Sequence, residues 1–285
     1  MAIFGRTDLA SEAHSRLLRE GAAEELPGLR SRQRQLEGIL VTEVDILDGR
    51  GVRALGKAEG RYRTLFLPSR AERGSESFPR AVKALGALLG ELLPPGQEGT
   101  VLIAALGNPD ITPDAVGSLT ASSTLVTRHL KESCPGEFRG FRPTALCRTG
   151  VLGTTGVESA AQIRALCDLL RPACVLAVDA LAGSELEGLC RSVQLCDTGI
   201  APGSGVGNNR EALNQQALGV PVIAIGVPTV VDAAALSHEV GTETLFVTPR
   251  DIDSAVRAVS RIIGYGINLA LHPGLTVEDI DLLLG

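Results

Sequence analysis

Two aspartates occupy positions where a carboxyl group could do chemistry. Asp114 follows Thr112 and Pro113 in the segment GNPDITPDAVG, and Asp179 closes the apolar run CVLAVD. Thr112 can cap a helix that begins at Pro113, so the dipole of that helix would keep Asp114 ionised. Asp179 should end a buried strand, where desolvation favours the protonated carboxyl group. Both positions are also common in proteins without chemistry, since acids often begin helices or cap the turn after a strand.

Considered together, the two carboxyl groups indicate acid–base catalysis. An ionised and a neutral carboxyl group at one edge of a sheet can act as base and acid on a water molecule that attacks an amide. We therefore predict that Asp114 and Asp179 are catalytic, with Asp114 as the base and Asp179 as the acid, although a coupled pair need not divide the roles so cleanly. Asn108 and Thr112 are candidates for positioning the scissile carbonyl.

A glycine-rich loop in DTGIAPGSGVGNNR is the third candidate feature. A dinucleotide-binding fingerprint would need its glycines directly after a strand, but Ile200, Ala201 and Pro202 intervene. A loop that exposes backbone N–H groups can instead bind a carbonyl oxygen or an oxyanion. The candidate substrate-binding residues in this loop are Gly203, Ser204, Gly205, Gly207 and Asn208.

The elements that must position these residues alternate along most of the chain. Predicted strands are GILVTEVDIL, RYRTLFLP, TVLIAALG, TALCR, ACVLAVDA, SVQLCDTG, PVIAIG and LFVT. Predicted helices cover about 9–20, 77–93, 113–131, 158–170 and 251–263, with others beginning near 228 and close to the C-terminus. This alternation predicts one α/β domain over residues 9–285, with a mostly parallel twisted sheet and helices on both faces. Ligands bind such sheets at the carboxyl ends of the strands, where the candidate residues fall.

Composition narrows the classes of function. The 285 residues are 44% hydrophobic and 3% aromatic, and 27 Lys and Arg against 33 Asp and Glu give a net charge of −6. A nucleic-acid partner is not expected, because its binding needs positive charge and stacking aromatics. Neither a signal peptide nor a membrane span is indicated. Six cysteines without C-x-x-C spacing indicate reduced thiols in a cytoplasmic protein, and the scattered histidines predict no metal site and no cofactor.

The order of motifs resembles that of the germination protease family of spore-forming bacteria. The matching segments are RTDLASEA, GKAEGRYRTL, ALGNPDITPDAVG, TRHL, GFRPTA, GVLGTTGVE, AVDALA, DTGIAPGSGVGNNR, GVPVIAIGVPTVVDA, VTPRDID and GYGINLALHPGL. Each segment alone is weak, but their number and order make the resemblance specific.

The resemblance implies a fold similar to the hydrogenase-maturation peptidases and an unusual aspartic endopeptidase activity. Family members degrade small acid-soluble spore proteins during germination, which places them in the forespore or spore core. They use two essential aspartates, which fall by motif on Asp114 and Asp179 of this sequence. Members are made as zymogens and assemble as homotetramers. The spore proteins are unfolded away from DNA, so they can enter a cleft as extended chains.

The N-terminal segment also resembles the cleavage motif of the family's substrates, Thr-Glu-(Phe/Ile)-Ala-Ser-Glu. Residues 7–12 read Thr-Asp-Leu-Ala-Ser-Glu. We therefore predict self-processing between Asp8 and Leu9, which would release residues 1–8 as a propeptide. The alternative is an ordinary helix start that Thr7 or Asp8 caps.

Two other functions remain open on the sequence. A metal-dependent maturation peptidase of the same fold would need His129 to reach Asp114 across a helix. A spore protein that binds peptides without cleaving them would keep its function when both aspartates are replaced. Sensitivity to chelators and replacement of the aspartates distinguish these cases.

Overall fold

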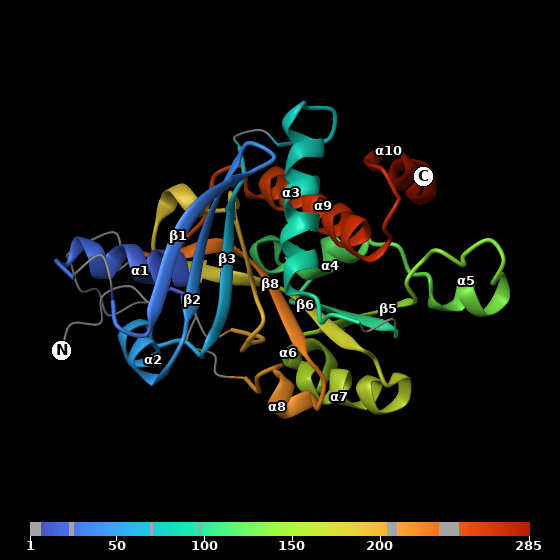
Figure 1. Ribbon diagram of the computed structural model, residues 1–285, viewed down its shortest axis with the longest axis horizontal. Coiled ribbons are helices and arrows are strands. Elements are labelled where there is room, and N and C mark those ends of the chain that lie inside the picture. Colours follow the sequence, from blue (N-terminus) through green and yellow to red (C-terminus); the bar gives the residue numbers. More distant parts are fainter. Residues whose placement is uncertain (1–6, 23–25, 69–70, 97–98, 204–209, 234–244) are drawn as a thin grey trace.

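A mixed β-sheet with helices on both faces forms the body of the protein (Figure 1). The computed structural model describes residues 7–22, 26–68, 71–96, 99–203, 210–233 and 245–285. Within these residues the sheet has nine strands in the order β1-β2-β3-β7-β8-β6-β4-β5, and β9 pairs with β8. The α/β fold that the sequence predicts is confirmed.

The parallel half of the sheet carries the sequence's most apolar runs. It consists of β4 (Val101–Leu106), β5 (Thr144–Gly150), β6 (Cys174–Gly183) and β8 (Val222–Asp232), in the order β8-β6-β4-β5. Every residue of β4 is buried, as expected of a strand that has helices on both sides. The carboxyl ends of β4 and β6 are neighbours, because Ala105 pairs with Val178.

The other half is antiparallel, so the prediction of a mostly parallel sheet was wrong in this respect. It contains β1 (Leu29–Leu36), β2 (Ile39–Ile46), β3 (Gly60–Phe66) and β7 (Ser192–Cys196), and the short β9 (Phe246–Val247) is also antiparallel to its neighbour. A two-residue turn joins β1 to β2, and only the short helix α2 (Gly49–Leu55) lies between β2 and β3. The two-residue turn between β1 and β2 is too short for the crossover that a parallel pair requires.

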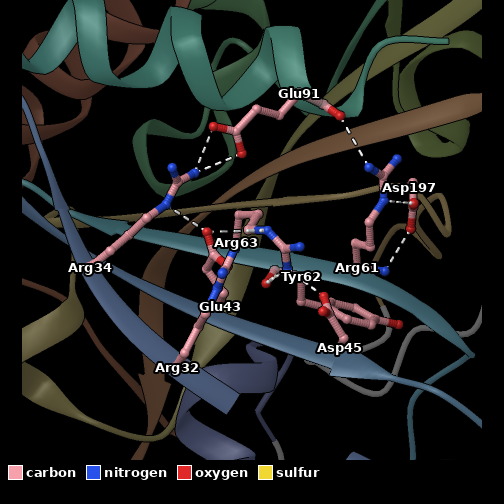
Figure 2. A network of polar contacts seen from close by, with 9 residues as sticks. All are labelled: Arg32, Arg34, Glu43, Asp45, Arg61, Tyr62, Arg63, Glu91 and Asp197. Atoms are coloured by element: carbon pink, nitrogen blue, oxygen red, sulfur yellow. Dashed lines mark hydrogen bonds and ion pairs between the residues drawn. The ribbon is translucent and has the colours of Figure 1, made fainter. Parts of the chain in front are cut away.

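Arginines and one buried acid tie the antiparallel strands together (Figure 2). Glu43 on β2 pairs with Arg32 and with Arg34, whose Nε lies 2.6 Å from Glu43 Oε1. Arg63 on β3 pairs with Asp45 at 2.7 Å. Arg34 also reaches Glu91 at 2.6 Å, and that glutamate belongs to α3 (Ser77–Leu92). The network therefore links three strands to a covering helix.

Helices cover both faces of the sheet, as predicted. α3 and α9 (Ile252–Leu271) form one layer with the main core, and α10 (Val277–Leu284) packs beside it. α7 (Ser159–Leu170) and α8 (Gln215–Leu218) cover the opposite face around a second core, preceded by the short α6 (Leu152–Thr155) (Figure 1). α1 (Ala10–Arg19) packs on β2 and β3 through a third cluster.

Two predicted helices differ in the structure. The helix predicted over 113–131 is broken into the 3-10 turn η1 (Thr112–Asp114) and two short helices, α4 (Val116–Ala121) and α5 (Arg128–Ser133). No helix begins at Pro228, because β8 continues through it to Asp232. The pairing of β8 with β6 shifts register just after Pro228, and such irregularities are where strands accept proline.

Candidate active site

Asp114 and Asp179 line one cavity at the carboxyl ends of β4 and β6. The cavity has a volume of about 280 Å³. Asp179 lies within β6 and is 4% exposed, whereas Asp114 lies on η1 and is partly exposed. The structure thus brings together the two carboxyl groups that the sequence singled out.

The turn after β4 fixes the carboxyl group of Asp114. The N–H of Asn108 donates a hydrogen bond of 2.7 Å to Asp114 Oδ2. Gly107 has φ +90°, and a Cβ atom there would lie 2.0 Å from the carbonyl oxygen of Asp114. Only glycine allows both this backbone conformation and this close approach.

A second glycine lets α4 approach the sheet beside the two acids. A Cβ atom on Gly117 would lie 2.4 Å from the carbonyl oxygen of Leu106 and 2.6 Å from that of Val178. These carbonyls belong to β4 and β6, next to the cavity. The close packing of α4 therefore sets the position of η1, and with it Asp114, relative to Asp179.

The surroundings of the two acids shift their pKa values to different extents. Burial raises the pKa of Asp179 well above its ordinary value, and the nearby charge of Asp114 adds to this, while a hydrogen bond from the N–H of Ala180 opposes it. Burial also raises the pKa of Asp114, but the N–H of Asn108 and the charge of Arg210 oppose that shift. The carboxyl group that keeps its proton more readily is therefore Asp179.

This finding corrects the sequence-based reason for an ionised Asp114. That reason required Asp114 in the first turn of a long helix, where the dipole would stabilise its charge. In the structure Asp114 ends a three-residue 3-10 turn and precedes α4, and its pKa is raised. Asp114 is still the better base of the two, because the pKa of Asp179 is raised well above its ordinary value.

Arg210 is a cavity residue that the sequence reasoning did not assign. It lines the cavity, and its charge favours the ionised forms of both Asp114 and Asp179. The only signal in the sequence was its place at the end of the glycine-rich segment. A cation at this position can steady negative charge that develops on the acids or on a substrate oxygen.

The other predicted site residues have different surroundings. Gly203 lines the cavity, whereas Ser204, Gly205, Gly207 and Asn208 lie outside the described residues. Asn108 and Thr112 do not line the cavity: the side-chain oxygen of Asn108 accepts the N–H of Asp110 at 3.0 Å, and the Thr112 hydroxyl donates to Asp253 Oδ1 at 2.7 Å. Asn108 contacts Asp114 through its backbone. Their predicted roles in binding substrate stay predictions.

The N-terminal segment runs beside the cavity. Asp8 and Ala182 are joined by two hydrogen bonds of 2.9 Å: the N–H of Asp8 donates to the Ala182 carbonyl, and the N–H of Ala182 donates to Asp8 Oδ2. Gln194 donates to the Asp8 carbonyl at 3.1 Å. Ala182 lines the cavity, three residues beyond Asp179 on β6. Asp8, the residue before the predicted processing site, is therefore held against β6 three residues beyond Asp179, and it lines a second cavity together with Gln194.

Apolar side chains make up much of the remaining wall. They are Leu106, Ile111, Pro113, Val151, Leu181 and Val230. A mostly apolar wall around a few polar groups strengthens electrostatic interactions inside and is typical of binding sites.

Two properties of the described residues bear on the alternatives. No three His, Cys, Asp or Glu side chains in that part of the chain gather as a metal ion would require. None of the helices seen there is both long and apolar enough to cross a membrane.

An α/β sheet that places two carboxyl groups in one cavity at its strand ends has the architecture of an enzyme. Comparison with known proteins identifies its family. The family model described as germination protease matches residues 5–241. The chain is 39% identical to the germination protease of Caldanaerobacter subterraneus subsp. tengcongensis, covering 98% of each chain, and 39% identical to that of Clostridium tetani, covering 97% of this chain and 98% of the relative.

A relative named germination protease from Bacillus thuringiensis subsp. konkukian is 36% identical, over 96% of this chain and 76% of its own. This chain therefore belongs to the germination protease family. It is a hydrolase of peptide bonds, an endopeptidase.

Proposed function

We propose that this protein is an endopeptidase of spore germination that hydrolyses small acid-soluble spore proteins, with Asp114 and Asp179 activating water. One observation carries the proposal: the two acids share a cavity, and burial raises the pKa of both. Perturbed carboxyl groups in a cleft are typical of catalytic acids and bases. The relatives are named germination proteases, which supplies germination as the setting.

The geometry supports a hydrolysis without a covalent intermediate. A water molecule between the carboxyl groups gives a proton to ionised Asp114 as its oxygen attacks the peptide carbonyl. Neutral Asp179 donates a proton to the leaving nitrogen, so the C–N bond breaks and the products are a carboxylic acid and an amine. Arg210 lowers the pKa of Asp114 and so favours the ionised base.

The proposal includes self-processing between Asp8 and Leu9. Its support is the likeness of residues 7–12 to the substrate motif and the position of Asp8 on β6, beside the cavity. The backbone N–H of Asp8 donates to the Ala182 carbonyl, one of the bonds by which an extended peptide binds to a sheet. The active assembly in the spore core is proposed to be a homotetramer, on the resemblance to the family.

The test is intact mass after the purified protein is held at mildly acidic pH. Wild type should lose residues 1–8, and Asp179→Asn should stay whole. Asp110→Asn is the matched control, because Asp110 is an exposed acid of the same loop that does not line the cavity. Equal cleavage of wild type and Asp179→Asn would refute catalysis by this pair, and cleavage at another bond would refute the predicted processing site.

A second arm uses a synthetic peptide with the sequence Thr-Glu-Phe-Ala-Ser-Glu within a longer chain, and a chain that begins at Leu9. Hydrolysis that persists in the presence of a chelator is expected. Loss of activity on chelation would favour the metal-dependent alternative, and no hydrolysis at all would favour a peptide-binding protein.

A further inference from the structure

Glu12 is a buried acid that the proposed reaction does not use. It lies in the first turn of α1 and is 5% exposed. Its Oε2 accepts three hydrogen bonds, from the Thr7 hydroxyl at 2.6 Å, the Ser184 N–H at 2.7 Å and the Ser184 hydroxyl at 2.9 Å. Its Oε1 has no hydrogen-bond partner among the described residues. A buried carboxylate oxygen without a donor is costly, so its presence calls for an explanation.

The chain keeps space around this carboxyl group. Cβ atoms on Gly183 and Gly188 would lie 3.2 and 3.3 Å from Glu12 Oε1, which is closer than such contacts usually are. Within the described part of the chain, the charge of Lys57 is near enough to interact with Glu12, but no lysine or arginine forms an ion pair with it, and burial raises the pKa of the Glu12 carboxyl group. Oε1 is thus enclosed without a hydrogen-bond donor, and a cationic group beside Glu12 would supply one.

The backbone nitrogen of Leu9 lies close enough to Glu12 to become that cation. The N–H of Leu9 donates to the Thr7 hydroxyl at 3.1 Å, and this same hydroxyl donates to Glu12 Oε2. Leu9 is the N-cap of α1 and Glu12 is three residues further on, the spacing at which an acid reaches back to the N-cap nitrogen. A single hydroxyl therefore separates the Leu9 nitrogen from the carboxyl group.

We propose that Glu12 is the binding site for the α-ammonium group that processing creates on Leu9. This rests on the proposed cleavage of the bond between Asp8 and Leu9. Water adds to the Asp8 carbonyl, the C–N bond breaks, Asp8 leaves as a carboxylate, and the Leu9 amine takes up a proton. Thr7 departs with the released peptide, so the ammonium replaces its hydroxyl as the donor to Glu12.

The ion pair would hold the new N-terminus after the peptide leaves. The Leu9 side chain is 1% exposed, and the N–H of Ala10 donates to Gln194 at 2.7 Å, so these residues are already anchored. Release of Asp8 exposes the backbone groups of Ala182 at the cavity rim, where an extended substrate could pair. Glu12 also binds Ser184, the residue that follows β6, and so keeps that rim fixed to α1.

The experiment uses a chain that begins at Leu9, prepared from a fusion by a site-specific protease. The rate at which an amine-acylating reagent labels the Leu9 α-amine at neutral pH is measured by peptide mass spectrometry. An ion pair that raises the pKa of this amine by one unit slows labelling about tenfold. The chain should therefore label about tenfold more slowly than its Glu12→Gln variant. Glu20→Gln, which changes an exposed acid at the end of α1, should label as slowly as the unaltered chain.

Equal labelling of the Leu9 chain and its Glu12→Gln variant would overturn the proposal. If Glu12→Gln does not fold, a chain with one glycine before Leu9 replaces it; the extra residue moves the amine away from Glu12, so fast labelling and a lower Tm are expected, and unchanged values refute the site. The measurements are repeated with Asp179→Asn. Labelling needs no catalysis, so it should be unchanged there even if the proposed peptidase mechanism fails.

Discussion

Glu43 and Asp179 are both buried acids on strands of the same sheet, but their surroundings differ. Burial alone would raise the pKa of Glu43, but Arg32, Arg63 and Arg34 outweigh it and hold that pKa below its ordinary value (Figure 2). At Asp179, burial is reinforced by a second acid and only partly opposed by a backbone N–H and Arg210, so the pKa rises. In the antiparallel half of the sheet, the buried carboxylate of Glu43 is paired with arginines. In the parallel half, the buried carboxyl group of Asp179 favours its protonated form.

The difference separates a structural acid from one suited to chemistry. A carboxyl group surrounded by arginines is a fixed anion that neither gives nor takes a proton near neutral pH. A carboxyl group with a raised pKa can do both, at a cost in stability that the rest of the fold must offset. The following predictions test whether this distinction holds.

The largest effect is expected on activity. Asp179→Asn should lower the rate of peptide hydrolysis by about 10²–10⁴-fold, the usual contribution of a positioned acid or base, with no loss of thermal stability. Glu43→Gln should leave the rate of the folded protein close to that of wild type. Peptide hydrolysis and Tm measured on both variants check this, and a similar loss of rate in both would remove the distinction.

The free energy of unfolding should be lowered more by Glu43→Gln than by Asp179→Asn. Glu43→Gln leaves Arg63, whose side chain is 8% exposed, without one of its partners, and loosens Arg32 and Arg34. Because Arg32 is well exposed and Arg34 is partly exposed, solvent screens part of the loss, so the free energy of unfolding should fall by about 2 kcal/mol. Urea titration measures it, with Glu72→Gln, an exposed acid, as the control. No change in the urea midpoint would show that the network is dispensable.

The pH dependence of stability should have opposite signs at the two acids. The pKa of Asp179 is raised in the folded protein, so its contribution is complete below the unfolded pKa of about 3.9 and is lost as pH rises through the folded pKa. Asp179→Asn should therefore gain stability relative to wild type as pH rises from about 4.

The pKa of Glu43 is lowered, so its contribution is present above the unfolded pKa of about 4.3 and is lost as pH falls through the folded pKa. The advantage of wild type over Glu43→Gln should thus shrink below about pH 4. Urea titrations between about pH 3 and 7 measure both trends, and a shared sign would contradict the assignment.

The smallest expected effect concerns Arg210. Its charge lowers the pKa of both cavity acids, so Arg210→Gln should move the acidic limb of the pH–rate profile to higher pH, by less than about one unit. Arg191→Gln is a control outside the cavity. A profile that stays in place would mean that Arg210 does not act on the acids.

The sequence predicted the parallel half of the fold well and the antiparallel half poorly. Continuous apolar runs such as 101–106 and 174–178 identify buried strands on their own. β1 was missed because LRSRQRQL has no apolar pattern: it is an edge strand, and its Arg32 and Arg34 are explained by Glu43 on the neighbouring strand and by Glu91 on α3. The sequence of this segment alone does not identify such partners.

Prediction from the sequence was limited in the same way at the candidate site. Asp114 and Asp179 stood out because each follows or ends a buried strand, and those strands proved to be neighbours. The pKa of Asp114 was misjudged because the break between η1 and α4 depends on how tightly Gly117 packs against β4 and β6, which is a tertiary feature. Arg210 reaches the cavity only because of how the chain folds. Its spacing from the two aspartates in the sequence therefore did not identify it as a cavity residue.

The contacts of the N-terminal segment can form only late in the synthesis of the chain. Asp8 and Ala10 bond to Ala182 and Gln194, partners that are 174 and 184 residues later in the chain. At ribosomal rates of about 5–20 residues per second, those partners are made roughly 10 to 40 s after the segment itself. Asp8 and Ala10 thus reach their places only after Ala182 and Gln194 have been made, long after they themselves are translated.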